Sequence, residues 1–275
     1  MNQFREKEMN LTLGYSPCPN DTFIFYALAH GRIGEGNINF RESLLDIETL
    51  NKSALRGEFD ITKVSFHAYL YIKNNYVLLN AGGALGRGCG PMIVAREPLK
   101  NKDLKGKRIA IPGAMTTAYL LLKLYEPECT KNIVIMPFHE ILDAVRSRIV
   151  DAGLIIHESR FTYSSYGLQK VIDLGQWWEE ETGLPIPLGC IVIKRRYYDI
   201  IEEVEEMIRK SISYAYGNRE EVMNYIKKYA RELDDSVVAS HIDLYVNGYS
   251  YDFGDDGKKA IDELLHRTEK LIGEI

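Results

Sequence analysis

The sequence predicts an α/β protein of two lobes, completed by a helical C-terminal tail. Short apolar runs alternate with helical patterns over most of the 275 residues, which is typical of strands buried between layers of helices. From Tyr197 to Ile275 the pattern is helical almost throughout. Apolar residues make up 45% of the chain, which is enough to form a sizeable core.

The first α/β unit is expected to extend from Leu11 to about Ala95. Its first helix would begin at Pro19, and Gly31 is placed to cap the C-terminus of that helix. A glycine-rich turn at 82–90 then leads into an apolar strand. Within this unit we expect strands at 11–15, 38–45, 60–65, 76–81 and 91–95, and helices at 19–30, 47–56 and 66–73.

The second unit, from about Arg96 to Gly189, repeats this alternation. We expect strands at 107–111, 133–136, 152–157 and 171–174, and helices at 117–125 and 140–150. Because the apolar runs are short and separated by helices, they indicate parallel sheets covered on both faces. A further strand at 191–194 precedes the helical tail.

We therefore expect lobe 1 to comprise residues 1–95 and 195–275 and lobe 2 to comprise residues 96–194, with a ligand cleft between them. The tail would return to the first unit, so the chain would cross between the lobes twice. By analogy of element order, this is the type II periplasmic-binding-protein fold. A doubly wound fold with a single sheet is the alternative, and in either case ligands bind beyond the C-terminal ends of the strands.

Composition disfavours several classes of protein. A net charge of -5 is unlike the basic face of nucleic-acid-binding proteins and disfavours adsorption to anionic membranes. The N-terminus is too polar for a signal peptide, and no apolar run approaches the ~18 residues of a membrane span, so we expect a cytoplasmic protein. The four cysteines are Cys18, Cys89, Cys129 and Cys190. They form no Cys-x-x-Cys pair and lack histidines at metal-ligand spacing, which predicts reduced thiols and no metal site.

Two strand-to-helix junctions are candidate binding sites. Ser16 and Asn20 lie where the first strand leads into the first helix, and Thr116 and Thr117 open the helix at 117–125. Such junctions direct backbone N–H groups and the positive end of the helix dipole toward a ligand, and threonine hydroxyls suit a carboxylate or a polyol. Ordinary helix capping is the structural alternative at both places.

Lys63, Val64 and Ser65 end the predicted strand at 60–65. A lysine at the C-terminal end of a strand would face the ligand region in this fold, although most lysines are solvated surface residues. The glycine-rich turn at 82–90 lacks the Gly-Lys-Ser/Thr ending of a phosphate loop, so we interpret it as close backbone packing rather than nucleotide binding.

His157 is the candidate catalytic residue, because it ends the apolar strand predicted at 152–157. A histidine delivered to the mouth of a cleft can act as a general base near neutral pH. Glu158 or a backbone carbonyl would fix its tautomer. A structural histidine at a strand end is the alternative, and His67 is the rival histidine near the proposed cleft.

Five motifs in order give the chain a resemblance to a known family. It resembles the 1,4-dihydroxy-6-naphthoate synthases of the futalosine route to menaquinone. The resemblance covers nearly the whole chain, and the motifs are SPCPNDTFIFY at 16–26, GGALGRG at 82–88, TTAY at 116–119, IIHESRFTY at 155–163 and LYVN at 244–247.

The resemblance implies the type II binding-protein fold and a lyase that acts on a small molecule without a metal or other cofactor. Such a lyase converts cyclic dehypoxanthinyl futalosine to 1,4-dihydroxy-6-naphthoate and dihydroxyacetone. The catalytic histidine of the family falls on His157. Its substrate-binding segments fall on Lys63-Val64-Ser65 and on Thr116-Thr117.

Three other functions share this fold. A solute-binding protein of a transporter would bind without reaction, and the polar N-terminus and His157 disfavour it. The sister enzyme that dehydrates chorismate is disfavoured by the motif at 16–26. A regulatory ligand-binding domain is disfavoured because no DNA-binding helix-turn-helix or basic face precedes it.

Overall fold

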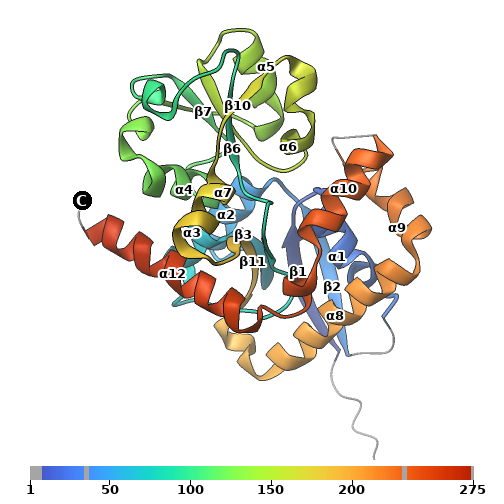
Figure 1. The fold of residues 1–275 in the computed structure, drawn as a ribbon. Helices are drawn as coiled ribbons and strands as arrows, with labels where there is room; N and C mark the ends of the chain where they lie inside the picture. The colour runs from blue at the N-terminus through green and yellow to red at the C-terminus, as the bar shows by residue number, and fades with distance from the viewer. Residues whose placement is uncertain (1–7, 34–36, 231–233, 274–275) are drawn as a thin grey trace, which may run out of the picture.

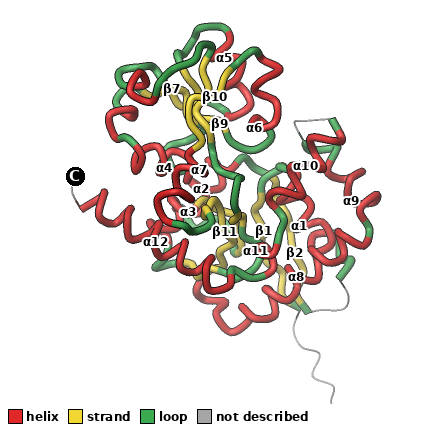
Figure 2. The backbone as a smooth tube through the Cα atoms, in the orientation of Figure 1, coloured by secondary structure: helices red, strands yellow, loops and turns green. Residues whose placement is uncertain are grey.

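A computed structural model describes residues 8–33, 37–230 and 234–273. Two sheets form the centres of two lobes, with one group of strands standing above the other in Figures 1 and 2. We call the elements around the six-stranded sheet lobe 1 and those around the five-stranded sheet lobe 2. The two-lobed α/β prediction is therefore correct.

The sheet of lobe 1 has the strand order β2-β1-β3-β11-β4, and β5 pairs with β11. β1 is parallel to β2 and β3, whereas β11 is antiparallel to β3, β4 and β5. The strands are β1 (Met9–Tyr15), β2 (Ile38–Leu44), β3 (Ile61–Ser65), β4 (Tyr76–Leu78), β5 (Ala84–Gly86) and β11 (Ile186–Lys194).

The sheet of lobe 2 has the strand order β10-β6-β9-β7-β8. β7 is parallel to β8 and β9, whereas β6 is antiparallel to β9 and β10. The strands are β6 (Met92–Ala95), β7 (Ile109–Ile111), β8 (Ile133–Ile135), β9 (Ala152–Ile155) and β10 (Gln169–Asp173).

Two details of the predicted architecture are wrong. Both sheets are mixed rather than parallel. The lobe boundaries also differ, because β6 belongs to the sheet of lobe 2 although 1–95 was assigned to lobe 1, and β11 belongs to the sheet of lobe 1 although 96–194 was assigned to lobe 2. A fully buried strand has the same apolar pattern in either direction and in either sheet, so its sequence does not reveal its hydrogen-bonding partner.

Helices cover both sheets, and the tail packs on lobe 1 as expected, with α1 beside α8 and α10 in Figure 1. The helices of lobe 1 are α1 (Pro19–Ala29), α2 (Ile47–Leu55), α3 (Phe66–Ile72), α8 (Ile201–Gly217), α9 (Arg219–Ile226), α10 (Asp235–Tyr245), α11 (Gly248–Tyr251) and α12 (Gly254–Gly273). Those of lobe 2 are α4 (Thr117–Tyr125), α5 (Ile141–Arg146), α6 (Ser159–Thr162) and α7 (Leu174–Thr182). Short 3₁₀ turns occupy Asn101–Leu104, Pro127–Thr130, Phe138–Glu140, Tyr163–Tyr166 and Arg195–Ile200.

One apolar core continues from lobe 1 into lobe 2. It joins Val64 and Val192 of the first sheet to Ile109, Leu120 and Trp178 of lobe 2. All five side chains are fully buried. The two lobes are therefore packed together through this shared core.

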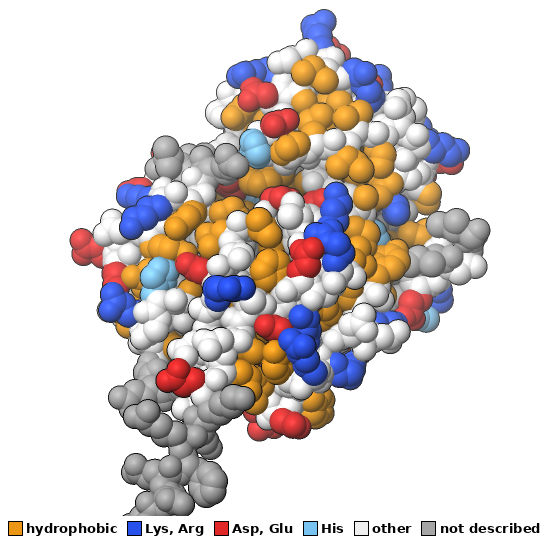
Figure 3. Space-filling model, turned by 180° about the vertical axis from the view of Figure 1, so that it is seen from behind, with side chains coloured by type: hydrophobic (Ala, Val, Ile, Leu, Met, Phe, Trp, Pro, Cys, Tyr) orange, Lys and Arg blue, Asp and Glu red, His pale blue; other side chains and the backbone are white. Residues whose placement is uncertain are grey.

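The surface shows no segregation of charge on the face seen from behind. Basic and acidic side chains are interspersed there in Figure 3, with apolar side chains between them. No helix in the described part of the chain combines the length and apolar character needed to cross a membrane.

Candidate active site

A pocket between the lobes contains the sequence-predicted site residues, with the exception of Val64. It encloses about 630 Å³ of empty space, part of which is open to solvent. Val64 lies on the other face of β3 and packs in the core, because successive side chains of a strand point to opposite faces. The predicted residues that line the pocket are Ser16, Asn20, Lys63, Ser65, Thr116, Thr117 and His157.

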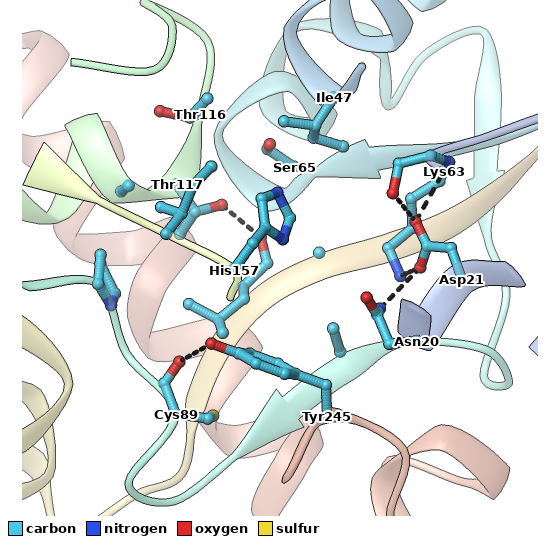
Figure 4. Close-up of a pocket in the computed structure, with 17 residues that line it drawn as sticks. Asn20, Asp21, Ile47, Lys63, Ser65, Cys89, Thr116, Thr117, His157 and Tyr245 are labelled. Atoms are coloured by element: carbon cyan, nitrogen blue, oxygen red, sulfur yellow. Dashed lines mark hydrogen bonds and ion pairs between the residues drawn. The ribbon is translucent and has the colours of Figure 1, made fainter. Parts of the chain in front are cut away.

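Asp21 organises the wall that lobe 1 contributes at the start of α1. Its carboxylate accepts hydrogen bonds from the Ser16 hydroxyl at 2.7 Å, the Asn20 amide at 2.8 Å and the Lys63 ammonium at 2.8 Å. Lys63 also approaches the carbonyl of Gly82 at 3.4 Å. Asp21 and Lys63 are 2% and 3% exposed, so each charge is balanced inside the protein and not by solvent. Figure 4 shows this group on one side of the pocket.

The start of α4 forms the facing wall, and its two threonines have different roles. The Thr116 hydroxyl accepts a hydrogen bond from the Tyr119 amide at 3.2 Å, so Thr116 is an N-cap. The Thr117 hydroxyl donates to the Leu188 carbonyl at 2.6 Å. The first-turn amides of Thr117 and Ala118 have no acceptor within the helix, and both residues line the pocket. Together with the helix dipole, these amides favour an anion.

Helix α2 of lobe 1 supports the loop that leads into α4. The Glu48 carboxylate accepts a hydrogen bond from the Met115 amide at 3.1 Å. One turn further on, the Asn51 amide donates to the Ser65 hydroxyl at 3.1 Å and to the Met115 carbonyl at 3.3 Å. Glu48 and Asn51 are buried, and burial raises the pKa of Glu48. This pair of side chains therefore joins the two walls below the pocket.

His157 lies just beyond β9, which ends at Ile155 and not at 157 as predicted. Its φ of 58° is in the left-handed region, which is rare and costly for a residue other than glycine. Burial lowers the pKa of His157 to about 4, so the imidazole is neutral at pH 7. The strained turn thus presents a neutral imidazole to the pocket. Figure 4 shows the His157 side chain among the lining residues.

Glu158 and His67, the two other candidate residues near His157, do not line the pocket. The Glu158 carboxylate has Oε2 at 4.0 Å from Nδ1 of His241 in α10. His67 is 3% exposed and is not among the lining residues, although its amide donates to the Thr117 hydroxyl at 3.4 Å. Burial also lowers the pKa of His67 to about 4. Its position makes His67 a support for the start of α4.

Several pocket residues were missed by the sequence analysis. Asp21 lies within the motif at 16–26 but was not among the predicted site residues, and neither was Tyr245 of the helical tail. The Tyr245 hydroxyl donates to the Cys89 carbonyl at 3.0 Å. Cys89 directly follows the motif at 82–88, and Tyr245 lies inside the motif at 244–247, so these motifs were the available signal. The other missed residues form the less polar walls: Ile47, Ala84, Pro91, Ala118, Ile156, Leu188 and Gly189.

A metal centre was not expected from the sequence. Within the described residues, no three histidine, cysteine, aspartate or glutamate side chains are grouped so that they could hold a metal ion. The four cysteines are buried free thiols.

Comparison with known proteins identifies the family. A family model described as menaquinone biosynthesis matches residues 11–270. A 1,4-dihydroxy-6-naphthoate synthase from Thermus thermophilus is 49% identical over 260 residues, which cover 94% of this chain and 94% of that protein. The chain belongs to this family. It is therefore an enzyme of menaquinone biosynthesis, and a Streptomyces coelicolor synthase of the same name is 46% identical over 94% of the chain and 92% of its own length.

Solved structures agree with the fold. A protein from Archaeoglobus fulgidus superposes with a TM-score of 0.89 at 39% identity, covering 97% of this chain and 98% of its own. The periplasmic aliphatic sulphonate-binding protein of Escherichia coli superposes with a TM-score of 0.68 at 17% identity, covering 98% and 88%. The predicted periplasmic-binding-protein fold is confirmed.

Proposed function

We propose that this enzyme cleaves cyclic dehypoxanthinyl futalosine to 1,4-dihydroxy-6-naphthoate and dihydroxyacetone, with His157 as the general base. Membership of the naphthoate synthase family supports the choice of reaction. The observation that carries the proposal is the pocket itself, in which a neutral imidazole from lobe 2 shares one cavity with an amide-rich helix start and a charge-balanced wall.

The shape and chemistry of the pocket suit a fused ring with polar ends. Ile47, Ile156, Leu188 and Tyr245 supply apolar surface for the bicyclic part of the substrate. An aromatic carboxylate would bind the first-turn amides of α4, where the helix dipole favours negative charge. The sugar-derived hydroxyl groups would lie toward lobe 1, where Ser65 offers a hydroxyl group at the pocket wall.

Lys63 and Asn20 would act mainly by holding the wall of lobe 1. Both donate to Asp21, so their strongest donors already have a carboxylate acceptor. Each residue still lines the pocket, and the one Lys63 ammonium proton that is donated neither to Asp21 nor to the Gly82 carbonyl would be available to a substrate oxygen.

In the proposed reaction, His157 removes a proton from a substrate hydroxyl. The electron pair of that O–H bond then forms a carbonyl as the adjacent carbon–carbon bond breaks, and the pair from the broken bond enters the other fragment. The protonated His157 returns its proton, dihydroxyacetone leaves, and the bicycle becomes aromatic. Aromatisation supplies driving force, so no oxidant or reductant enters the balance. A general base must be unprotonated before it can accept a proton, and the low pKa of His157 keeps its imidazole unprotonated near neutral pH. General-base catalysis contributes about 10²–10⁴-fold in rate.

The test is to incubate purified, metal-free protein with cyclic dehypoxanthinyl futalosine and to detect 1,4-dihydroxy-6-naphthoate by chromatography and mass. We expect product at a catalytic rate from the wild type and from a His139→Asn control, because His139 is a partly exposed residue outside the pocket. His157→Asn should lower kcat by about 10²–10⁴-fold.

Three results would contradict the proposal at different points. Near-normal turnover by His157→Asn would remove the assignment of the base and leave the reaction intact. Tight binding of the compound by folded wild type without any product would instead favour a non-catalytic binding protein, and product from chorismate would favour the dehydrating sister enzyme.

A further inference from the structure

His241 is a fully buried histidine in the contact between the lobes, and the proposed reaction does not use it. It belongs to α10, which packs beside α1 of lobe 1. Its Nε2 lies 2.9 Å from Oδ1 of Asn20 in α1. On its other side, its ring centroid lies 6.1 Å from that of His157 in lobe 2, with the two planes 24° apart. One side chain of lobe 1 is therefore stacked beside the proposed base of lobe 2.

The hydrogen bonds around His241 determine its tautomer. The Asn20 amide nitrogen donates to Asp21 at 2.8 Å, so the oxygen of the same amide faces His241 and must accept. Nε2 of His241 therefore carries a proton. Burial and the neighbouring His157 both lower the pKa of His241 well below its ordinary value, so Nδ1, which faces Glu158, is unprotonated.

The ring of His157 depends on packing for its orientation. Its backbone is in the strained left-handed region, and no described residue makes a hydrogen bond to its imidazole. Within the described residues, its two aromatic ring neighbours come from different lobes. Phe138 of lobe 2 contacts it edge-on at 5.0 Å, and His241 of lobe 1 stacks beside it at 6.1 Å. If lobe 1 moved away, His157 would lose one of its two neighbours.

We propose that His241 is a positioning residue, which sets the ring of His157 for catalysis only when the lobes are packed as they are here. The inference rests on the proposed role of His157 as the base, and it adds that His241 holds the His157 ring in its orientation. Full burial and the hydrogen bond to Asn20 both hold the His241 ring in place, and that ring then limits the rotation of His157. A misplacement of about 1 Å in such a group lowers the rate by about 10²-fold.

Three variants separate the ring of His241 from its hydrogen bond. His241→Phe keeps an aromatic ring beside His157 and loses the bond to Asn20. His241→Gln keeps a donor for Asn20 and loses the ring, and His241→Ala loses both. His266→Gln, at an exposed position of α12, is the control.

We expect His241→Ala and His241→Gln to lower kcat about 10–100-fold with little change in KM. His241→Phe should recover much of that loss, and the control should match wild type. The pH titration of the His157 ring, followed by its C2–H proton resonance, gives a second readout. In His241→Ala the pKa of His157 should rise from about 4 toward its ordinary 6.5 as water reaches the ring. Other titratable groups around the two rings are Cys18, Asp21, Lys63, Glu158 and Tyr245.

The outcomes separate this inference from the proposed function. Wild type that forms product, with kcat and the His157 resonance unaffected by His241→Ala, overturns the positioning role and leaves the reaction standing. Recovery by Gln but not by Phe also overturns it, because the hydrogen bond and not the ring would then matter. If wild type forms no product but the His157 resonance responds to His241, the reaction fails and the positioning stands.

Discussion

The two strand-to-helix junctions that face the pocket are built differently, although both have the sequence of a capped helix start. At α1, the carboxylate of Asp21 pairs with Ser16, Asn20 and Lys63, so the polar groups are satisfied within lobe 1. At α4, Thr116 caps the Tyr119 amide, and the pocket is lined by Thr117 and Ala118, whose amides have no acceptor within the helix. A satisfied junction gives a rigid wall, whereas an incompletely satisfied one gives a place for a ligand.

The largest effect should come from breaking the satisfied junction. Asp21→Asn leaves the Lys63 ammonium buried without a counterion, and we expect the free energy of unfolding to fall by about 3–5 kcal/mol in urea denaturation. The double variant Asp21→Asn, Lys63→Met should regain part of this loss. Glu128→Gln is the control, because its ion pair with Lys131 is exposed. A double variant as unstable as the sum of its single variants would show that the ion pair is not the cause.

A smaller loss should follow from crowding the loop before α4. A Cβ atom at Gly113 would come within 2.3 Å of the Glu48 carboxylate. We expect Gly113→Ala to destabilise the protein by about 1–3 kcal/mol and to raise KM, because the loop that carries Met115 must shift. Gly217→Ala, where nothing lies within 4 Å of the new atom, should be near neutral. Equal thermal unfolding temperatures for the two variants would contradict this account.

Removing the cap at α4 should have a still smaller effect on stability. Thr116→Val loses the acceptor for the Tyr119 amide and should cost about 1 kcal/mol. Thr116→Ser keeps that acceptor and should behave like wild type. We expect calorimetry to show this difference. If the Thr116→Val and Thr116→Ser variants are equally stable, the Thr116 hydroxyl is not acting as a cap.

The smallest effect should be seen on changing pH near neutrality. Since His157 must be neutral to act as the proposed base and burial lowers its pKa to about 4, kcat/KM should stay flat down to about pH 5 and fall as the pH drops through about 4. A fall centred on 6.5 would contradict the burial of the ring in the free enzyme.

The same shift contributes to stability. Below its ordinary pKa of 6.5, the histidine takes up a proton in the unfolded chain but not in the fold, so stability is lost as pH falls from about 6.5 to about 4. His67 contributes a slope of the same sign. The difference between wild type and His157→Asn therefore isolates the contribution of His157.

The sequence predicted most elements within a few residues, because amphipathic helices and short apolar strands have local signatures. It did not predict the direction of β11 or its place between β3 and β4, since those depend on pairing between distant segments. Of the predicted site, Val64 failed to reach the pocket because strand side chains alternate. Asp21 and Tyr245 reach it through contacts with Lys63 and Cys89, which no local pattern records.

The insertion of β11 has a consequence for the order of folding. All strands of lobe 2 come from one continuous segment, 92–173, so this sheet can form from local contacts soon after that segment is synthesised. The sheet of lobe 1 must wait, because β11 separates β3 from β4 and is made more than a hundred residues later. Tyr245 and His241 emerge later still. A nascent chain would therefore carry a folded lobe 2 on the ribosome before the pocket could exist. The incomplete sheet of lobe 1 would be the part that chaperones have to protect.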